Sequence, residues 1–472
     1  MKVLLIQPRG VKEVREEYVS TQFPMNLGYI AAALKNNGHV VRLLDFNVQN
    51  IDLAGYILQF SPAVVGLTAM TPAINAAGEI AKKIKGIDPK IIVVLGGVHA
   101  SAMPIDTMNN FSGIDFLVYG EGEETVKELF RAIEGGRDFS GVPGIVYRKD
   151  GGLIKNPPRP LIKNLDEVLF PARDLVDMSF YKKSHVSRGF SRKYQNILEL
   201  MTSRGCPNRC IFCAGHINYG ASLRFRSFEN IAAEMTECVK KYGINHISIE
   251  DDTFTLNRQL VERFCDFCKE HRLTWNCNSR VNTVTFDLLK KMGESGCKKI
   301  SFGVESGSPR ILSLIKKGTT LEQVRNAFSL AKAAGIRYVE GTFILGCHID
   351  ETLEDIGMTK KLIWELLPDF VMLSVMCPFP GTEIYDDMRR EGYLPENPNW
   401  DDFSFFIDRE KYVRLRHITH AELNRIQRDV IKKYFTSPRY IWSQLKRMRS
   451  RSELSYFANL GVAYAKKFLF NR

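Results

Sequence analysis

The chain has 472 residues, of which 44% are hydrophobic and 25% are charged, which is typical of a soluble enzyme and too long for one compact core. It contains no uncharged apolar run long enough for a membrane-spanning helix, and its first residues lack the apolar stretch of a secretory signal. Its ten scattered cysteines exclude a disulfide scaffold and predict a cytoplasmic protein with reduced thiols.

Residues 1–140 alternate short apolar runs with helical patterns, and strands are predicted at 3–6, 40–45, 64–69, 91–97 and 116–120. Because these runs are continuously apolar and rich in β-branched residues, each strand is expected to be buried on both faces. The pattern predicts an α/β domain with a doubly wound, Rossmann-like parallel sheet, whose ligands lie beyond the carboxyl ends of the strands.

Residues 141–190 are rich in proline and contain the turn sequence KDGG at 149–152, which predicts a linker with a small hairpin. A second βα series follows in residues 191–400, with strands near 197–202, 246–250, 274–279, 298–304, 338–345 and 369–376. These six units predict a partial (βα)6 barrel. Residues 401–472 are expected to form a C-terminal helical, basic extension, with a helical pattern from Thr419 onward.

Three cysteines stand on one loop after the first predicted barrel strand, in the sequence TSRGCPNRCIFC. Cys206, Cys210 and Cys213 can converge on one metal centre, and thiolate ligands favour iron–sulfur or zinc chemistry. A structural zinc ion needs a fourth protein ligand, which His216 could supply. A cubane held by three thiolates instead leaves one iron open to a small molecule.

This loop, with the aromatic Phe212 before its third cysteine, resembles the signature of the radical S-adenosylmethionine enzymes. The segments RFRSFENIAAEM, EDDTFT, SRVN, GCKKISFGVESGS, KKGTT and FPGTEIY resemble the branch of that superfamily that carries an N-terminal cobalamin-binding domain, over roughly residues 1–435. The resemblance implies that the three cysteines bind a 4Fe-4S cluster and that S-adenosylmethionine chelates its open iron. An external electron donor such as flavodoxin or ferredoxin would then reduce the cluster, and cleavage would give a 5′-deoxyadenosyl radical.

Polar residues fall at the predicted carboxyl ends of the barrel strands, where barrel active sites are built. They include Asp251, Asp252, Arg280 and Glu305. The acidic residues could equally cap the helices or turns that follow them, and a buried Arg280 could anchor the barrel. The resemblance implies that Asp251 or Asp252 contacts the ammonium group of S-adenosylmethionine and that Glu305 reaches its ribose.

The resemblance implies three further contacts with S-adenosylmethionine. Lys317 would pair with its carboxylate, while Phe212 and the segment 341–346, which ends at Gly346, would flank the adenine. Glycines there let the backbone approach a flat ring.

A second pair of cysteines, Cys265 and Cys268, lies one turn apart within a helical pattern that also bears apolar residues. Core packing is the expected role, with a second cluster as the alternative.

One edge of the predicted N-terminal sheet gathers small and polar residues after three of its strands. No Gly-x-Gly-x-x-Gly follows the first strand, which argues against an ordinary dinucleotide site. The edge resembles the cobalamin-binding module, and the implied cobalamin contacts are Thr68, Thr71, Gly96, Gly97 and Glu121. Because no Asp-x-His-x-x-Gly follows the first strand, the cobalt is expected to receive no protein nitrogen, including from His99. The alternative is a scaffold that only covers the barrel mouth.

The net charge of +12 is concentrated at the C-terminus, where residues 436–472 carry eight Lys and Arg against Glu453 alone. Aromatic residues are interspersed with these charges, which suits a helix at a membrane surface and a lipid substrate. Packing of the aromatics on the protein itself is the alternative. No helix-turn-helix or zinc-finger pattern supports nucleic-acid binding.

Together these features predict a radical enzyme that uses cobalamin to methylate an unactivated carbon of a small molecule or lipid. A radical cyclase or rearrangement enzyme of the tetrapyrrole or lipid type, without methyl transfer, is the enzymatic alternative. A cobalamin- or cluster-binding sensor is the alternative from another class.

Overall fold

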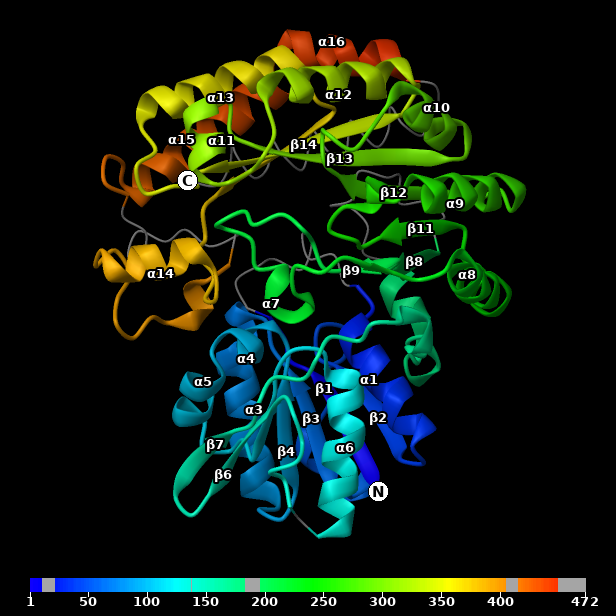
Figure 1. Ribbon diagram of the computed structural model, residues 1–472, viewed down its shortest axis with the longest axis vertical. Coiled ribbons are helices and arrows are strands. Elements are labelled where there is room, and N and C mark those ends of the chain that lie inside the picture. Colours follow the sequence, from blue (N-terminus) through cyan, green and yellow to red (C-terminus); the bar gives the residue numbers. More distant parts are fainter. Residues whose placement is uncertain (11–21, 137, 183–195, 405–414, 449–472) are drawn as a thin grey trace.

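The computed structural model describes residues 1–10, 22–136, 138–182, 196–404 and 415–448. Figure 1 shows two α/β halves, with the N-terminal sheet in blue and cyan below and a second sheet, from green to yellow, above. Both sheets are built mainly of parallel strands. This confirms the predicted α/β class with two successive βα series.

The N-terminal sheet has the strand order β2-β1-β3-β4-β5-β6-β7. Its strands are β1 (Lys2–Gln7), β2 (Val40–Asp45), β3 (Val64–Thr68), β4 (Ile92–Gly96), β5 (Phe116–Val118), β6 (Ile145–Lys149) and β7 (Gly152–Lys155). The helices are α1 (Met25–Asn36), α2 (Leu53–Phe60), α3 (Ile74–Ile87), α4 (Val98–Ala102), α5 (Pro104–Asn110) and α6 (Gly122–Gly135), with a 3₁₀ turn η1 (Thr71–Ala73). The five parallel strands agree with the predicted doubly wound sheet.

The hairpin expected in the linker is part of this sheet. β6 pairs antiparallel with β5, and β7 pairs antiparallel with β6. Asp150 and Gly151 form the turn with positive φ angles of 49° and 78°, as a two-residue hairpin loop requires. The N-terminal sheet therefore continues beyond residue 140. The hairpin covers the edge of β5, which would otherwise be open.

The second sheet is parallel throughout, in the order β15-β14-β13-β12-β11-β8, and forms an open barrel wall. Its strands are β8 (Ile197–Leu200), β11 (His246–Ile249), β12 (Thr274–Ser279), β13 (Cys297–Glu305), β14 (Tyr338–Leu345) and β15 (Phe370–Val375). The helices are α8 (Phe228–Tyr242), α9 (Arg258–Glu270), α10 (Phe286–Glu294), α11 (Pro309–Leu314), α12 (Leu321–Ala333), α13 (Leu353–Leu366) and α14 (Glu383–Arg390).

Short elements connect the two halves and flank the barrel. They are β9 (Ser203–Arg204), which pairs with β10 (Arg224–Phe225), the helix α7 (His216–Tyr219), and the 3₁₀ turns η2 (Leu165–Glu167), η3 (Arg173–Leu175), η4 (Met178–Lys182), η6 (Phe254–Leu256) and η7 (Trp400–Asp402). In Figure 1, α7 and β9 lie between the two sheets.

The barrel helices begin at polar caps that the sequence supplies. The side chain of Ser227 accepts a hydrogen bond from the Asn230 amide at the start of α8. Thr320 and Thr352 form capping boxes for α12 and α13. Each helix then buries its apolar face against the strands, which places the strand carboxyl ends and their loops at one rim.

Two helices follow the barrel, α15 (His420–Phe435) and α16 (Pro438–Arg447). Thr419 and Glu422 form a capping box at the start of α15, which packs against the edge strand β15. Within the described ranges, no helix combines the length and apolarity needed to cross a bilayer.

Candidate functional site

The cysteine loop lies between β9 and α7, at the junction of the two halves. Cys210 is buried, while Cys206 and Cys213 are half-buried. An N–H group is directed at each sulfur. The Asn208 side-chain amide donates to Cys206 Sγ at 3.4 Å, and the Gly215 backbone donates to Cys213 Sγ at 3.4 Å. Arg280 Nη1 lies 4.0 Å from Cys210 Sγ.

Such donors are the groups that stabilise ligating thiolates, so the loop fits an iron–sulfur cluster. Burial raises the pKa of the Cys213 thiol to about 11, and the negative charges of Asp252, Cys210 and Cys206 contribute to the rise. The three thiols therefore share one dehydrated neighbourhood, where a cationic metal centre would favour their deprotonation.

A single-ion site is not formed at this loop. Within the residues that the structure describes, no group of three or more His, Cys, Asp or Glu side chains is arranged to hold one metal ion. A cubane requires a wider arrangement, because each thiolate binds a separate iron.

Buried charges extend from the cysteine loop along the barrel rim. Arg280 donates to the Lys317 carbonyl oxygen, and Lys317 Nζ donates to Glu305 Oε1 at 2.6 Å. All three side chains are buried. Glu305 has a positive φ of 68°, which turns the chain sharply at the end of β13. The structure thus brings three of the predicted residues together in one hydrogen-bonded series that begins at Cys210.

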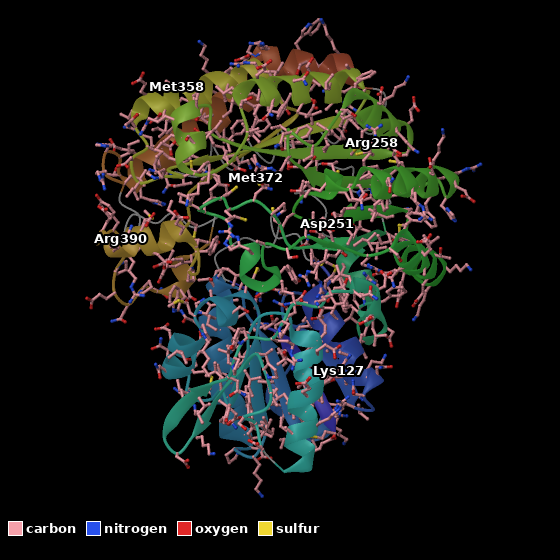
Figure 2. All side chains as sticks on the ribbon, viewed as in Figure 1. Lys127, Asp251, Arg258, Met358, Met372 and Arg390 are labelled. Carbon is pink, nitrogen blue, oxygen red and sulfur yellow. The ribbon has the colours of Figure 1, made fainter. Side chains whose placement is uncertain are left out.

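The two candidate aspartates differ in their surroundings. Asp251, at the end of β11 (Figure 2), accepts hydrogen bonds from the Thr202 amide, the Thr202 hydroxyl and the Ser203 hydroxyl. Burial raises the pKa of Asp251, and these hydrogen bonds act in the opposite direction. Both carboxylate oxygens are therefore engaged in holding the chain segment that leads into the cysteine loop.

Asp252 is exposed and its carboxylate lies beside Gly215 and Cys213, since a Cβ at Gly215 would be 3.1 Å from Asp252 Oδ2 and 3.4 Å from Cys213 Sγ. Desolvation raises the pKa of Asp252, and His216 lowers it. Of the two aspartates, Asp252 is thus the one placed to meet a ligand at the cluster loop.

Two residues were expected to contact the adenine, Phe212 and Gly346. Phe212 is half-buried and packs against the main core. Gly346 has a φ of +75°, and a Cβ there would meet Leu423 at 2.8 Å and Leu415 at 3.1 Å. The missing side chain of Gly346 therefore makes room for the C-terminal extension, which differs from the expected approach of an adenine ring.

At the N-terminal sheet edge, Gly97 has a φ of +101°, and a Cβ there would lie within 2.8 Å of Ala69 and Thr68 atoms. The Gly96-Gly97 turn after β4 thus lies directly against the end of β3. Thr71 Oγ1 lies 3.2 Å from His99 Nδ1, whereas no hydrogen-bond partner is found for buried His99 Nε2 among the described residues. The unpaired buried nitrogen of His99 beside this turn fits a polar ligand such as cobalamin at this edge.

Glu121 has a different place from the one expected. Its carboxylate accepts hydrogen bonds from Arg204 Nη1 at 3.0 Å, Arg224 Nη1 at 2.8 Å and the Ile162 amide at 2.7 Å. Arg204 also donates to Glu123. These groups are buried, and both oxygens of Glu121 face the barrel half. The structure therefore makes Glu121 a link between the two halves.

Sequence reasoning did not single out Arg204 or Arg224 as partners of Glu121, because nothing local in the chain relates them. It also passed over Glu351, a buried carboxyl that accepts a hydrogen bond from the Cys347 amide at 2.8 Å. Desolvation raises the pKa of Glu351 to about 7. Glu351 lies five residues after Gly346, in the short loop between β14 and α13. An acidic residue in so short a loop is the signal that could have identified Glu351 as an acceptor for the loop's own backbone.

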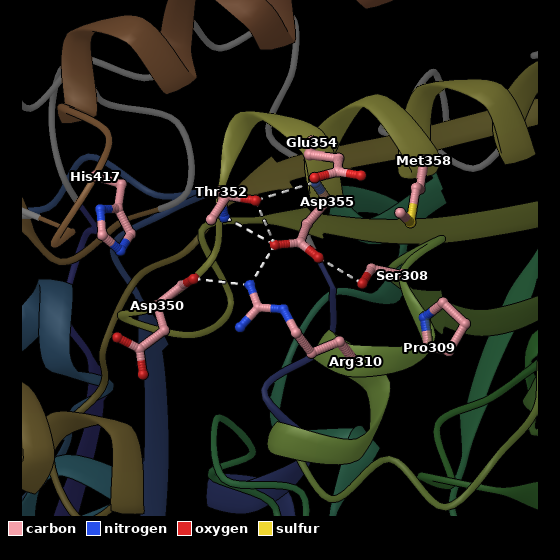
Figure 3. Close-up of a pocket in the computed structure, with 9 residues that line it drawn as sticks. All are labelled: Ser308, Pro309, Arg310, Asp350, Thr352, Glu354, Asp355, Met358 and His417. Carbon is pink, nitrogen blue, oxygen red and sulfur yellow. Dashed lines mark hydrogen bonds and ion pairs between the residues drawn. The ribbon is translucent and has the colours of Figure 1, made fainter.

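A hollow of about 520 Å³ lies where the loops after β13 and β14 lead into α11 and α13 (Figure 3). Ser308 Oγ donates to Asp355 Oδ1 at 2.6 Å, and Arg310 pairs with the same carboxylate. These hydrogen bonds lower the pKa of Asp355. None of the residues expected to bind a cofactor lines this hollow.

Two family models match the chain. Residues 12–130 match the B12 binding domain, and residues 200–363 match the Radical SAM superfamily. These matches coincide with the sheet edge around Gly97 and with the cysteine loop at the barrel mouth. The fold and the thiol loop define a radical S-adenosylmethionine enzyme.

Curated relatives extend the match over most of the chain. An uncharacterized methyltransferase from Pyrococcus horikoshii is 34% identical over 446 residues, covering 93% of this chain and 94% of the relative. An anaerobic magnesium-protoporphyrin IX monomethyl ester cyclase from Rubrivivax gelatinosus is 28% identical over 406 residues, covering 82% and 70%. The chain belongs to the family of radical S-adenosylmethionine enzymes that carry a B12-binding domain. The cofactors of its two domains are a 4Fe-4S cluster, S-adenosylmethionine and cobalamin.

Solved structures show the same fold. The radical methyltransferase TsrM from Kitasatospora setae, with cobalamin and a [4Fe-4S] cluster bound, superposes with a TM-score of 0.70 at 20% identity, covering 90% of this chain and 84% of that chain. The cobalamin-dependent radical enzyme OxsB, with aqua-cobalamin and S-adenosylmethionine bound, gives a TM-score of 0.77 at 20% identity, covering 99% and 72%.

Proposed function

We propose that this enzyme is a cobalamin-dependent radical methyltransferase that acts on an unactivated carbon, with Cys206, Cys210 and Cys213 as the cluster ligands. The relative from Pyrococcus horikoshii that carries the name methyltransferase supports transfer of a methyl group. When bound, the reduced cluster and S-adenosylmethionine supply a 5′-deoxyadenosyl radical that removes a hydrogen atom from the substrate, and methylated cobalamin supplies the methyl group. An external donor such as flavodoxin or ferredoxin supplies the electrons.

One observation carries this proposal: the Gly-Gly turn and the cysteine loop adjoin. The helix α4, which begins directly after Gly97, packs against α7, which begins three residues after Cys213. A Cβ at Gly381 would contact both Ile217 of α7 and Ala102 of α4, at 3.0 and 3.1 Å. Cofactors on these two loops would therefore meet at the same junction, where one substrate can reach both.

The rim residues have separate roles in the proposal. Asp252 meets the ammonium group of S-adenosylmethionine, because its carboxylate lies beside Cys213 while that of Asp251 is engaged. Arg280 holds Cys210 and the Lys317 carbonyl in place. Glu305 and Lys317 form a buried ion pair. When S-adenosylmethionine binds, its ribose hydroxyls would hydrogen-bond to Glu305 and its carboxylate would hydrogen-bond to Lys317, in place of the bond between the two side chains.

A radical cyclisation without methyl transfer is the second candidate. The 28% identity with the cyclase from Rubrivivax gelatinosus favours it. The two candidates share the cluster, S-adenosylmethionine and cobalamin, and they differ in whether a methyl group leaves S-adenosylmethionine.

Anaerobic incubation of the reconstituted protein with cobalamin, S-adenosylmethionine and a chemical reductant separates the candidates. A methyltransferase makes both 5′-deoxyadenosine and S-adenosylhomocysteine, because S-adenosylmethionine methylates the reduced cobalamin. A cyclase makes 5′-deoxyadenosine alone. The variant with Cys206→Ala, Cys210→Ala and Cys213→Ala should make no 5′-deoxyadenosine. If the intact protein makes neither product, the proposal is wrong and a sensor role gains support.

A further inference from the structure

The helix α16 presents polar side chains to the protein and apolar side chains to solvent. The Tyr440 hydroxyl donates to the Asp369 carbonyl at 3.0 Å, and Gln444 Nε2 donates to Asp369 Oδ1 at 3.0 Å. Arg447 Nη1 donates to the same carboxylate oxygen at 2.5 Å. Asp369 is fully buried, so these hydrogen bonds fix the rotation of the helix about its own axis.

The opposite side of α16 carries large apolar side chains on consecutive turns. Ile441, Trp442 and Leu445 are 45%, 60% and 45% exposed. Their spacing places them on one face, since residues three and four apart are neighbours on a helix surface. A water-exposed helix normally has the reverse arrangement, with its apolar stripe against the core. Such a continuous apolar stripe indicates an interaction surface.

Positive charges lie beside this stripe on α16 and near it in the sequence. Arg439 and Lys446 are exposed on α16 itself, with Lys446 Nζ 5.2 Å from the centre of the Trp442 ring. Lys432 and Lys433 are exposed in the last turn of the preceding helix α15. The sequence that follows, residues 449–472, adds five Lys and Arg against one Glu.

We propose that the α16 surface, made of Arg439, Ile441, Trp442, Leu445 and Lys446, docks the protein on an anionic lipid bilayer. Apolar insertion with Trp and Leu, flanked by Lys and Arg, is what an interfacial helix uses. A second copy of the chain meeting the same surface would bring like charges together, and the basic C-terminal residues would do the same. An anionic bilayer satisfies the apolar stripe and the charges at once.

The position of α16 is compatible with this docking. Figure 1 shows α16 at the end of the barrel half that lies away from the N-terminal sheet. Docking there leaves the junction between the cysteine loop and the Gly-Gly turn uncovered. The inference is independent of the reaction proposed above.

Vesicle co-sedimentation of the full-length protein tests the proposal, with vesicles of phosphatidylcholine alone and of phosphatidylcholine with phosphatidylglycerol. We expect binding to the phosphatidylglycerol vesicles, weakened by added salt. The triple variant Ile441→Ser, Trp442→Ser and Leu445→Ser should bind about tenfold or more weakly. Arg439→Gln and Lys446→Gln should each weaken binding about fivefold, on anionic vesicles only. Leu58→Ser, which changes an apolar side chain that is 71% exposed on α2, should bind as the intact protein does.

Three results would overturn the proposal. The first is a failure of the lipid binding itself: the intact protein stays in the supernatant with phosphatidylglycerol vesicles, or the triple variant binds these vesicles as tightly as the intact protein does. The second is a dimer of the intact protein in sedimentation velocity that the triple variant dissociates, which would identify a second copy as the occupant. The third is binding only after removal of residues 449–472, which would mean that this segment covers α16. Unchanged circular dichroism of the triple variant controls for misfolding.

Discussion

Replacing Arg204 by Met tests how the two halves are held together. Arg204 is 4% exposed, and its guanidinium donates to Glu121 at 3.0 Å and to Glu123 at 2.5 Å. In the variant Glu121 keeps Arg224, but the buried Glu123 carboxylate loses the arginine it pairs with. Removing one partner of a buried ion pair leaves an uncompensated charge and costs about 3–5 kcal/mol. We expect Arg204→Met to lower the free energy of unfolding by that amount.

Urea unfolding followed by circular dichroism, at the first transition, measures the loss. The double variant Arg204→Met with Glu123→Leu should recover part of it, because the stranded carboxylate is gone. Arg263→Met is the matched control, since Arg263 also pairs with a carboxylate, that of Glu229, at 2.5 Å, but the two side chains are 51% and 69% exposed. It should lose about 0–1 kcal/mol. An equal loss in Arg204→Met and Arg263→Met would refute the reasoning.

Three further predictions concern cysteine and histidine side chains. Cys265 and Cys268 are fully buried in the core, so Cys265→Ala and Cys268→Ala should keep the iron content of the reconstituted protein at about four atoms; loss of half the iron would reveal an auxiliary cluster. We expect cobalamin to bind with its own dimethylbenzimidazole base displaced, so the electron paramagnetic resonance of bound cobalt(II) should show no nitrogen splitting and should be the same in His99→Ala, whereas splitting that vanishes in the variant would make His99 the axial ligand. Burial lowers the pKa of His99 from 6.5 to about 4, so the unfolded chain binds the proton first and stability falls as the pH drops from 6.5 towards 4. The loss should reach about 3 kcal/mol in urea unfolding, and a His99→Phe variant with the same pH dependence would contradict it.

The strands and the cysteine loop could be predicted because their signals are local. Continuous apolar runs located β1 to β5, and the second βα series located the six barrel strands, to within a few residues. The convergence of Cys206, Cys210 and Cys213 could be predicted from their spacing, because residues so close together in one loop are also close together in space. The roles of these cysteines as ligands stay a prediction that iron analysis tests.

Contacts between distant residues could not be predicted in the same way. Glu121 follows β5, where a ligand contact was expected, yet its partner Arg204 lies 83 residues further along the chain. Asp251 and Asp252 are adjacent in sequence, and only the position of Thr202 beside β11 decides which carboxylate is engaged. The hairpin of β6 and β7 carried a turn signal, but no signal for the sheet that it joins.

The sequence by itself determined the two βα series, the thiol loop and the presence of an aromatic, basic C-terminus, because periodicity and spacing are properties of adjacent residues. The tertiary structure decided which side of each element meets a partner. For α16 the sequence contains both an apolar and a polar face, and only the buried carboxylate of Asp369 turns the polar face inward. A buried charge needs a hydrogen-bonding partner where it lies, so the Asp369 carboxylate determined which face of α16 turns inward. Hydrophobicity alone would have turned the apolar face inward.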